Sequence, residues 1–249
     1  MSGLKVAFLG ATGGMGRALS RKMAARGDTL CILGRRPEEL EKSATDLRAR
    51  AGDGDVFTAH CDLNDFDTLA PALESAIEQM GGLDTVVITA AMFGTQDALE
   101  ADEALRRKML FVNFTGTVEF CELARRHLLS NPGGGTLCVF SSVAGDRGRK
   151  PVALYGSTKA GLSHYLESLD HKHRADGLNT ICVKPGFVKT GMTAGLSPPP
   201  FAGEPEQVAN DVIKAITKGK PLIYTPGMWR WVMFVIKRLP RFVMRKIGF

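Results

Sequence analysis

The sequence has few cysteines, and their arrangement excludes two classes of protein. Five cysteines are scattered over 249 residues without a C-x-x-C pair. An odd number and irregular spacing argue against a disulfide framework and against a zinc site, so we expect no bound metal and a reducing, cytoplasmic environment. The first residues also lack the basic, apolar and small-residue regions of a secretory leader, and no signal peptide is predicted.

Acidic residues are absent from residues 228–249, a segment that we call the tail. Its bases account for the whole net charge of +6, because the chain holds 32 bases and 26 acids. They are Arg230, Lys237, Arg238, Arg241, Arg245 and Lys246. A basic tail can bind nucleic acid, but this one is also rich in Trp, Phe, Met, Val and Ile, which favours the surface of an anionic membrane. We therefore divide the chain into a body, residues 1–227, and the tail.

The tail also lacks the apolar length to span a bilayer. Its longest apolar run, residues 231–236, is far below the ~20 residues that a spanning helix needs, and Pro240 interrupts any helix before it. On a helical wheel the bases share one arc, and the apolar remainder includes Trp229, Val232, Met233 and Ile236. This pattern predicts a helix lying in the interface of the inner, cytoplasmic face of a membrane. The same apolar residues also suit packing on the body or across a dimer.

Apolar, β-branched runs alternate with helical patterns along the body. Strands are predicted at residues 5–10, 29–33, 55–60, 84–89, 136–141 and 180–184, with a further candidate at 222–225. Strands that alternate with helices indicate a parallel, doubly wound sheet. The sequence therefore predicts a single α/β domain of Rossmann type.

A glycine-rich turn follows the first predicted strand, in "FLGATGGMG". Gly10, Gly14 and Gly16 let the backbone turn tightly and approach a pyrophosphate, whose charge is favoured by the N–H groups at a helix start. Such a turn can also be a purely structural connection between a strand and a helix. Read as a dinucleotide site, it contributes six residues: Gly10, Thr12, Gly13, Gly14, Met15 and Gly16.

The residues about twenty positions further on bear on the choice of cofactor. An acid there would bind the adenosine ribose of NAD(H), whereas this chain has Arg35 and Arg36. Two bases favour the 2′-phosphate of NADP(H), although NAD(H) remains open and the arginines can equally be solvated charges at a helix start. Asp62 and Leu63 follow the third strand, where a carboxylate can accept from the adenine amine or cap the next helix.

Tyr155 and Lys159 form a Y-x-x-x-K pair in "ALYGSTKAGL". On a helix this spacing puts both side chains on one face, so the ammonium is expected to lower the pKa of the phenol towards neutrality and make it a proton donor. Thirteen residues upstream, Ser142 supplies a hydroxyl that can hold a carbonyl oxygen. Together with the glycine turn, these residues predict carbonyl and alcohol redox chemistry on a nicotinamide.

The order "GATGGMG", "CDL", Asn113 in "LFVNFTG", "SSVAG", "YGSTK" and "PGFVKT" resembles the short-chain dehydrogenase/reductase family over residues 5–190. The resemblance implies that Ser142, Tyr155 and Lys159 are catalytic and that Asn113 completes a proton relay through water. It also implies a homo-oligomer and further cofactor contacts. These are Ala90, Tyr155, Lys159, Pro185, Gly186, Val188 and Thr190. One departure is that Ile88, Thr89, Ala90 and Ala91 stand where the family usually has N-N-A-G.

The C-terminal half resembles a narrower group, the decaprenylphosphoryl-2-keto-pentose reductases of bacterial arabinan synthesis. The segments are "SSVAGDRGRKPVALYGSTKAGL", "PGFVKTGMTAGL" and the tail. This resemblance implies a lipid-linked 2-keto sugar as substrate and a flavin-dependent oxidase as partner. It also conflicts with the arginines, because the mycobacterial relative is adapted to NADH.

Bases between Ser142 and Tyr155 form a candidate anion anchor. Arg147, Arg149 and Lys150 are expected to hold the phosphate of the substrate or to lie in a solvated loop. The small-residue segment 191–205 is the expected substrate lid. Two readings remain as alternatives: a general NADPH-dependent ketone or acyl-chain reductase with the same catalytic residues, and a non-catalytic dinucleotide-binding membrane adaptor.

Overall fold

A parallel sheet forms the centre of the molecule in the computed structural model, which describes residues 3–247 except 53, 196 and 200. In the described residues its strands run in the order β3-β2-β1-β4-β5-β6-β7. They are β1 (Lys5–Leu9), β2 (Thr29–Gly34), β3 (Val56–His60), β4 (Thr85–Ile88), β5 (Gly135–Phe140), β6 (Leu178–Pro185) and β7 (Leu222–Thr225). The predicted strands, the further candidate included, are confirmed to within about two residues.

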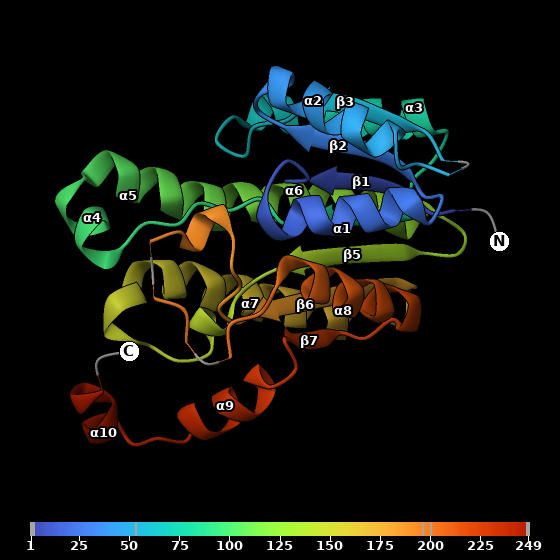
Figure 1. Ribbon diagram of the computed structural model, residues 1–249. Helices are drawn as coiled ribbons and strands as arrows, with labels where there is room; N and C mark the ends of the chain where they lie inside the picture. The colour runs from blue at the N-terminus through green and yellow to red at the C-terminus, as the bar shows by residue number, and fades with distance from the viewer. Residues whose placement is uncertain (1–2, 53, 196, 200, 248–249) are drawn as a thin grey trace.

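Helices cover both faces of the sheet (Figure 1). They are α1 (Gly14–Ala25), α2 (Pro37–Arg48), α3 (Leu69–Met80), α4 (Gln96–Ala101), α5 (Glu103–Leu110), α6 (Thr117–Ser130), α7 (Ala153–His173), α8 (Pro205–Lys218), α9 (Trp229–Ile236) and α10 (Arg241–Lys246). Short helical turns are η1 (Phe66–Thr68), η2 (Phe111–Gly116), η3 (Val143–Gly145), η4 (Lys150–Val152) and η5 (Gly191–Thr193). The single Rossmann-type domain predicted from the sequence is confirmed.

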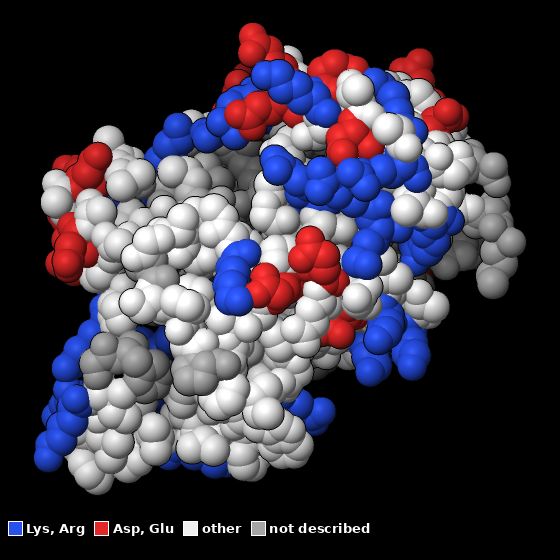
Figure 2. Space-filling model, viewed as in Figure 1, with Lys and Arg blue, Asp and Glu red and all other residues white. Residues whose placement is uncertain are grey.

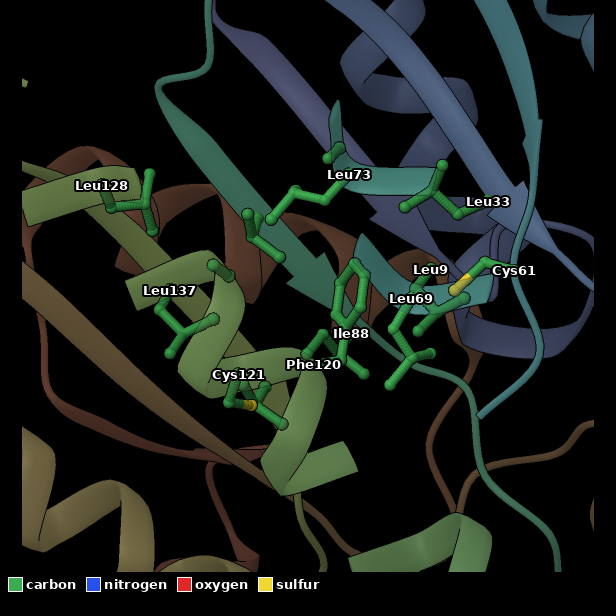
Figure 3. Close-up of a cluster of buried hydrophobic side chains, with 14 of the residues drawn as sticks. Leu9, Leu33, Cys61, Leu69, Leu73, Ile88, Phe120, Cys121, Leu128 and Leu137 are labelled. Carbon is green, nitrogen blue, oxygen red and sulfur yellow. The ribbon is translucent and has the colours of Figure 1, made fainter. Parts of the chain in front are cut away.

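The two faces of the sheet carry separate apolar clusters. Along β1, Ala7 and Leu9 join the cluster with α3, α6 and α7, whereas Val6 and Phe8 join the cluster with α1, α2 and α8. Figure 3 shows the first cluster, in which Phe120 from α6 lies beside Ile88 of β4. Because both faces are buried, the central strands are apolar at nearly every position rather than at alternate ones.

The tail forms two helices at one end of the molecule. Helix α9 follows β7, and α10 lies beyond it, near the loop that precedes α7 (Figure 1). None of the helices in the described part of the chain is long and apolar enough to cross a bilayer.

Candidate active site

A cleft of about 390 Å³ opens at the carboxyl ends of β1, β2 and β4. The strand order reverses around β1, which is where open α/β sheets bind their ligands. Twelve of the residues predicted to bind the cofactor line this cleft. They are Gly10, Thr12, Gly13, Gly14, Met15, Gly16, Arg35, Arg36, Asp62, Leu63, Ala90 and Thr190.

Two glycines of the turn, Gly10 and Gly16, have no room for a side chain. Gly10 has φ +100°, and a Cβ atom on it would lie 2.5 Å from the backbone nitrogen of Ala90. A Cβ atom on Gly16 would lie 2.1 Å from the carbonyl oxygen of Gly10. Helix α1 begins here at Gly14 with no side-chain cap among the described residues, so its first N–H groups are available to an anion. The turn therefore fits the pyrophosphate of a dinucleotide.

Thr89 stands where the family usually has an asparagine, and it ties β4 to the glycine turn. Its hydroxyl donates to the carbonyl oxygen of Gly10 at 2.9 Å. The hydroxyl also fills the space beside Gly16, where a Cβ atom would lie 2.5 Å away. The departure from N-N-A-G thus keeps a polar link between the strand and the turn. The sequence shows a polar residue, Thr89, at the end of a buried strand, but it does not show that Thr89 binds the carbonyl of Gly10.

The two arginines after β2 differ in their pairing. Arg36 contacts Glu39 at 2.6 Å on the exposed start of α2. Arg35 lines the cleft and has no ion pair within the described residues. Asp62 lines the cleft as well, and its carboxylate accepts from the backbone N–H of Asn64 at 2.9 Å. Of the two arginines, Arg35 is therefore the better candidate to bind an anionic group in the cleft.

Three polar side chains converge between β5 and α7. Tyr155 and Lys159 lie on α7, and the Ser142 hydroxyl, which follows β5, lies close enough to the Tyr155 phenol to influence its pKa. The Lys159 Nζ lies 5.8 Å from the centre of the tyrosine ring and donates to the carbonyl oxygen of Phe140 at 3.0 Å. The ring of Phe93 packs edge-on against Tyr155, with centroids 5.2 Å apart. Sequence reasoning missed Phe93.

The expected lowering of the Tyr155 pKa is wrong for this structure. Burial raises the pKa of Tyr155 to about 12, and the Ser142 hydroxyl only partly opposes this change. Burial also lowers the pKa of Lys159 to about 8. Both shifts have the same cause, because burial penalises the charged form of either group. At neutral pH the phenol therefore keeps its proton and the ammonium keeps its charge.

Asn113 lies in η2, a π-helix between α5 and α6, and its side chain is fully buried. Its Oδ1 accepts from the backbone N–H of Met92, and its Nδ2 donates to the Met92 carbonyl, both at 2.7 Å. The amide thus ties η2 to the segment after β4. Met92 lines the dinucleotide cleft, so the buried amide fixes one wall of that cleft.

Five residues predicted to contact the cofactor do not line the cleft: Tyr155, Lys159, Pro185, Gly186 and Val188. The side chain of Val188 is buried in the core beside α8, which leaves its backbone as the group that can face a ligand. Gly186 packs so closely against Trp229 of α9 that a Cβ atom would lie 2.1 Å from the indole. The tail therefore reaches the loop that begins after β6.

Two of the three loop bases contact the tail. Arg147 donates to the carbonyl oxygen of Leu239 at 2.7 Å, and Lys150 donates to that of Arg245 at 2.5 Å. Burial lowers the pKa of Arg149. None of the three lines the cleft in the described residues. In the structure one N–H group each of Arg147 and Lys150 thus binds a backbone carbonyl of the tail, and the prediction that these bases hold a substrate phosphate stays a prediction.

The apolar wheel residues of the tail face the body. Trp229 and Met233 are buried in a small cluster with Val143, and Val232 and Ile236 pack against it. The indole N–H of Trp229 donates to the carbonyl oxygen of Phe201, in the expected lid, at 3.1 Å. Residues 196 and 200 of that lid lie outside the described residues. This packing corrects the prediction that Trp229, Val232, Met233 and Ile236 face a membrane.

A buried ion pair behind the Ser142 loop was not predicted. The carboxylate of Asp146 contacts Lys184 at 2.5 Å and accepts from the Tyr224 hydroxyl at 2.6 Å. The Asp146 side chain is only 2% exposed and that of Lys184 is 11% exposed. The group links the loop after β5 to β6 and β7, so it holds in place the loop that carries Ser142.

The fold and this site define an NAD(P)(H)-dependent oxidoreductase. A family model described as short chain dehydrogenase matches residues 5–200, and the chain belongs to that family. It is 32% identical over 245 residues to an uncharacterized oxidoreductase of Mycobacterium tuberculosis, covering 97% of this chain and 96% of that one.

Two further comparisons agree with this assignment. Carbonyl reductase family member 4 of Xenopus tropicalis is 26% identical over 215 residues, which cover 83% of this chain and 88% of that one. A short-chain type dehydrogenase/reductase from Mycobacterium ulcerans has the same fold, with a TM-score of 0.81 at 23% identity over 90% of both chains.

Proposed function

We propose that this chain reduces a ketone to a secondary alcohol with NADPH, and that the ketone is carried by a lipid-linked substrate. The observation that carries the proposal is the placement of the Tyr155 phenol beside Ser142 and Lys159, in surroundings that favour its protonated form. A nicotinamide held in the cleft supplies the hydride. Ser142 and Tyr155 hold the carbonyl oxygen, and the phenol gives its proton to the charge that develops there. Lys159, charged below about pH 8, stabilises the phenolate that remains.

The preference for NADPH rests on Arg35. A guanidinium that lines the cleft without an ion-pair partner in the described residues suits a 2′-phosphate. We expect a higher kcat/KM with NADPH than with NADH, and we expect Arg35→Ala to narrow the gap by about 1 to 3 kcal/mol, the scale of a charge-assisted hydrogen bond. Measuring kcat/KM for both cofactors in parent and variant tests this.

Arg36→Ala is the matched control, because Arg36 already contacts Glu39 at 2.6 Å. It should change the ratio of the two cofactors less than Arg35→Ala does. A parent that prefers NADH would contradict the assignment of Arg35 and favour the cofactor choice of the arabinan reductases.

For the substrate we propose the 2-keto group of a polyprenylphosphoryl pentose. Its reduction would complete an epimerisation from the ribo to the arabino configuration, with a flavin-dependent oxidase supplying the ketone. The proposal is supported by the resemblance of the C-terminal half and by a basic, apolar tail that contacts the loop after Ser142. A second candidate is a general ketone reductase. It is favoured by the likeness to carbonyl reductase family member 4 and by the engagement of Arg147 and Lys150 with the tail.

The substrate test compares NADPH oxidation on a polyprenylphosphoryl 2-keto-pentose with that on the same keto sugar phosphate without the lipid. A preference of at least about tenfold in kcat/KM for the lipid form, or about 1.4 kcal/mol, supports the lipid-linked substrate. Equal values would favour the general reductase. Tight NADPH binding without turnover on any ketone would point to the non-catalytic adaptor.

A further inference from the structure

The tail has a second apolar face, which the body leaves uncovered. Trp231 is 63% exposed and Phe242 is 64% exposed, and Met228, Phe234 and Val235 are also exposed. We call these five residues the outer face. Positions 228, 231 and 235 follow the three- and four-residue spacing of one side of a helix. They lie opposite Trp229 and Met233, which already anchor α9 to the body. The outer face is therefore not needed to hold the tail in place.

The charged residues of the tail itself are all basic. The tail carries six Lys or Arg residues and no Asp or Glu. Figure 2 shows α9 and α10 at the lower left as white side chains with blue at the margins, while the red side chains lie over the body. Two arginines form cation–π contacts with aromatic rings of the outer face. The guanidinium carbon of Arg238 lies 3.5 Å from the centre of the Phe234 ring, and that of Arg230 lies 5.9 Å from the centre of the Trp231 ring.

The outer face combines exposed apolar side chains with guanidinium groups that contact its aromatic rings. This combination suits an anionic lipid surface. Arginine stems can lie along apolar surface while the charged ends reach anionic headgroups. Nucleic acid would match the charge but would leave Val235 and Phe242 without an apolar partner. A second copy would bring two tails of the same sign together, which like charges oppose. We propose that the outer face docks on an anionic phospholipid bilayer, with Trp231, Phe234 and Phe242 among the headgroups.

Docking in this way turns one edge of the active site towards the bilayer. The inner side of the tail contacts the lid through Trp229 and Phe201, and it contacts the loop after Ser142 through Arg147 and Leu239. The bilayer would therefore meet the molecule on the side where the tail contacts these two segments. This orientation rests on the proposed function only for the origin of the ketone, since binding to lipid needs no catalysis.

The test is flotation of the full-length protein, without substrate, on phosphatidylcholine vesicles with and without phosphatidylglycerol. The parent should float with the anionic vesicles, float less at high salt, and remain in the load with the neutral ones. Combined Trp231→Ser, Phe234→Ser and Phe242→Ser should reduce the partition coefficient by about tenfold or more. Arg238→Gln should reduce it roughly fivefold, the effect of one base near an anionic surface.

Phe66→Ser is the control, because Phe66 is also an exposed aromatic residue but lies outside the tail, in η1. It should float like the parent. Trp231→Ala provides a milder variant if the triple variant does not fold. A parent that stays in the load with anionic vesicles would overturn the proposal, and so would outer-face variants that float as well as the parent. Loss of a dimer in the variants, with no flotation of the parent, would assign the face to a second copy instead.

Reductase activity on a water-soluble ketone, measured on the same samples, separates this inference from the proposed function. If the protein floats but reduces no ketone, the docking surface is supported and the proposed reaction is contradicted. If it reduces the ketone but never floats, the reaction is supported and the docking surface is contradicted.

Discussion

Replacing Tyr155 by Phe should abolish ketone reduction and leave NADPH binding nearly intact. The variant keeps the ring that packs against Phe93 and loses only the phenolic hydroxyl beside Ser142. Removing a positioned general acid costs about 10² to 10⁴ in rate. The loss should fall on kcat, because the proton is given only as charge develops on the oxygen. Steady-state kinetics and a fluorescence titration of NADPH measure the two quantities.

Two variants on the same helix calibrate this result. Ser157→Ala removes an exposed hydroxyl that donates to the Ala153 carbonyl at 2.8 Å, and it should behave like the parent. Lys159→Ala should lower both turnover and cofactor affinity, since Lys159 is expected to contact the cofactor as well as support the phenol. Turnover of Tyr155→Phe within a few-fold of the parent would show that another group donates the proton.

The sheet could be predicted because local patterns determine it. The central strands β1, β4 and β5 are short, mostly apolar runs, which are typical of strands buried on both faces of a parallel sheet. The glycine turn could be predicted for the same reason, because its steric requirement acts on neighbouring residues such as Gly10 and Gly16. The motif spacing then indicated which side chains meet at the site.

Contacts between distant residues could not be predicted in this way. Asp146 meets Lys184 and Tyr224 across 38 and 78 residues of sequence, and Arg147 meets Leu239 across 92. No periodicity connects such positions. The charge of Arg147 suggested an anion, but its guanidinium donates to the backbone carbonyl of Leu239, between α9 and α10. Charge alone does not distinguish a substrate phosphate from a backbone carbonyl.

The pKa of Tyr155 and the orientation of α9 were predicted wrongly because both depend on burial. The spacing of Tyr155 and Lys159 indicates that they are neighbours, but not how far burial opposes the charge of each group. Helix α9, with the sequence WRWVMFVI, is apolar on nearly every side. A wheel identifies its apolar residues without indicating which face the body covers, and here the body covers the face with Trp229 and Met233.

Asp146→Ala should be the most destabilising single change near the site that preserves the catalytic residues. It would leave the Lys184 ammonium, 11% exposed, without the carboxylate that it contacts at 2.5 Å. Removing one partner of a buried ion pair costs about 3 to 5 kcal/mol of unfolding free energy. Because Asp146 follows η3, which begins directly after Ser142, kcat should fall as well. Denaturant unfolding and ketone reduction measure the two effects.

Three comparisons identify the cause of this loss. Tyr224→Phe removes one hydrogen bond to Asp146 and should cost about 1 kcal/mol. Glu204→Ala breaks an exposed pair with Lys189 and should cost at most about 1 kcal/mol, since both side chains are more than half exposed. Asp146→Leu combined with Lys184→Met should regain much of the lost stability, because no charge is then left buried. If Asp146→Ala were as stable as Glu204→Ala, water would have to reach Lys184, and the pair would not be the group that holds the Ser142 loop.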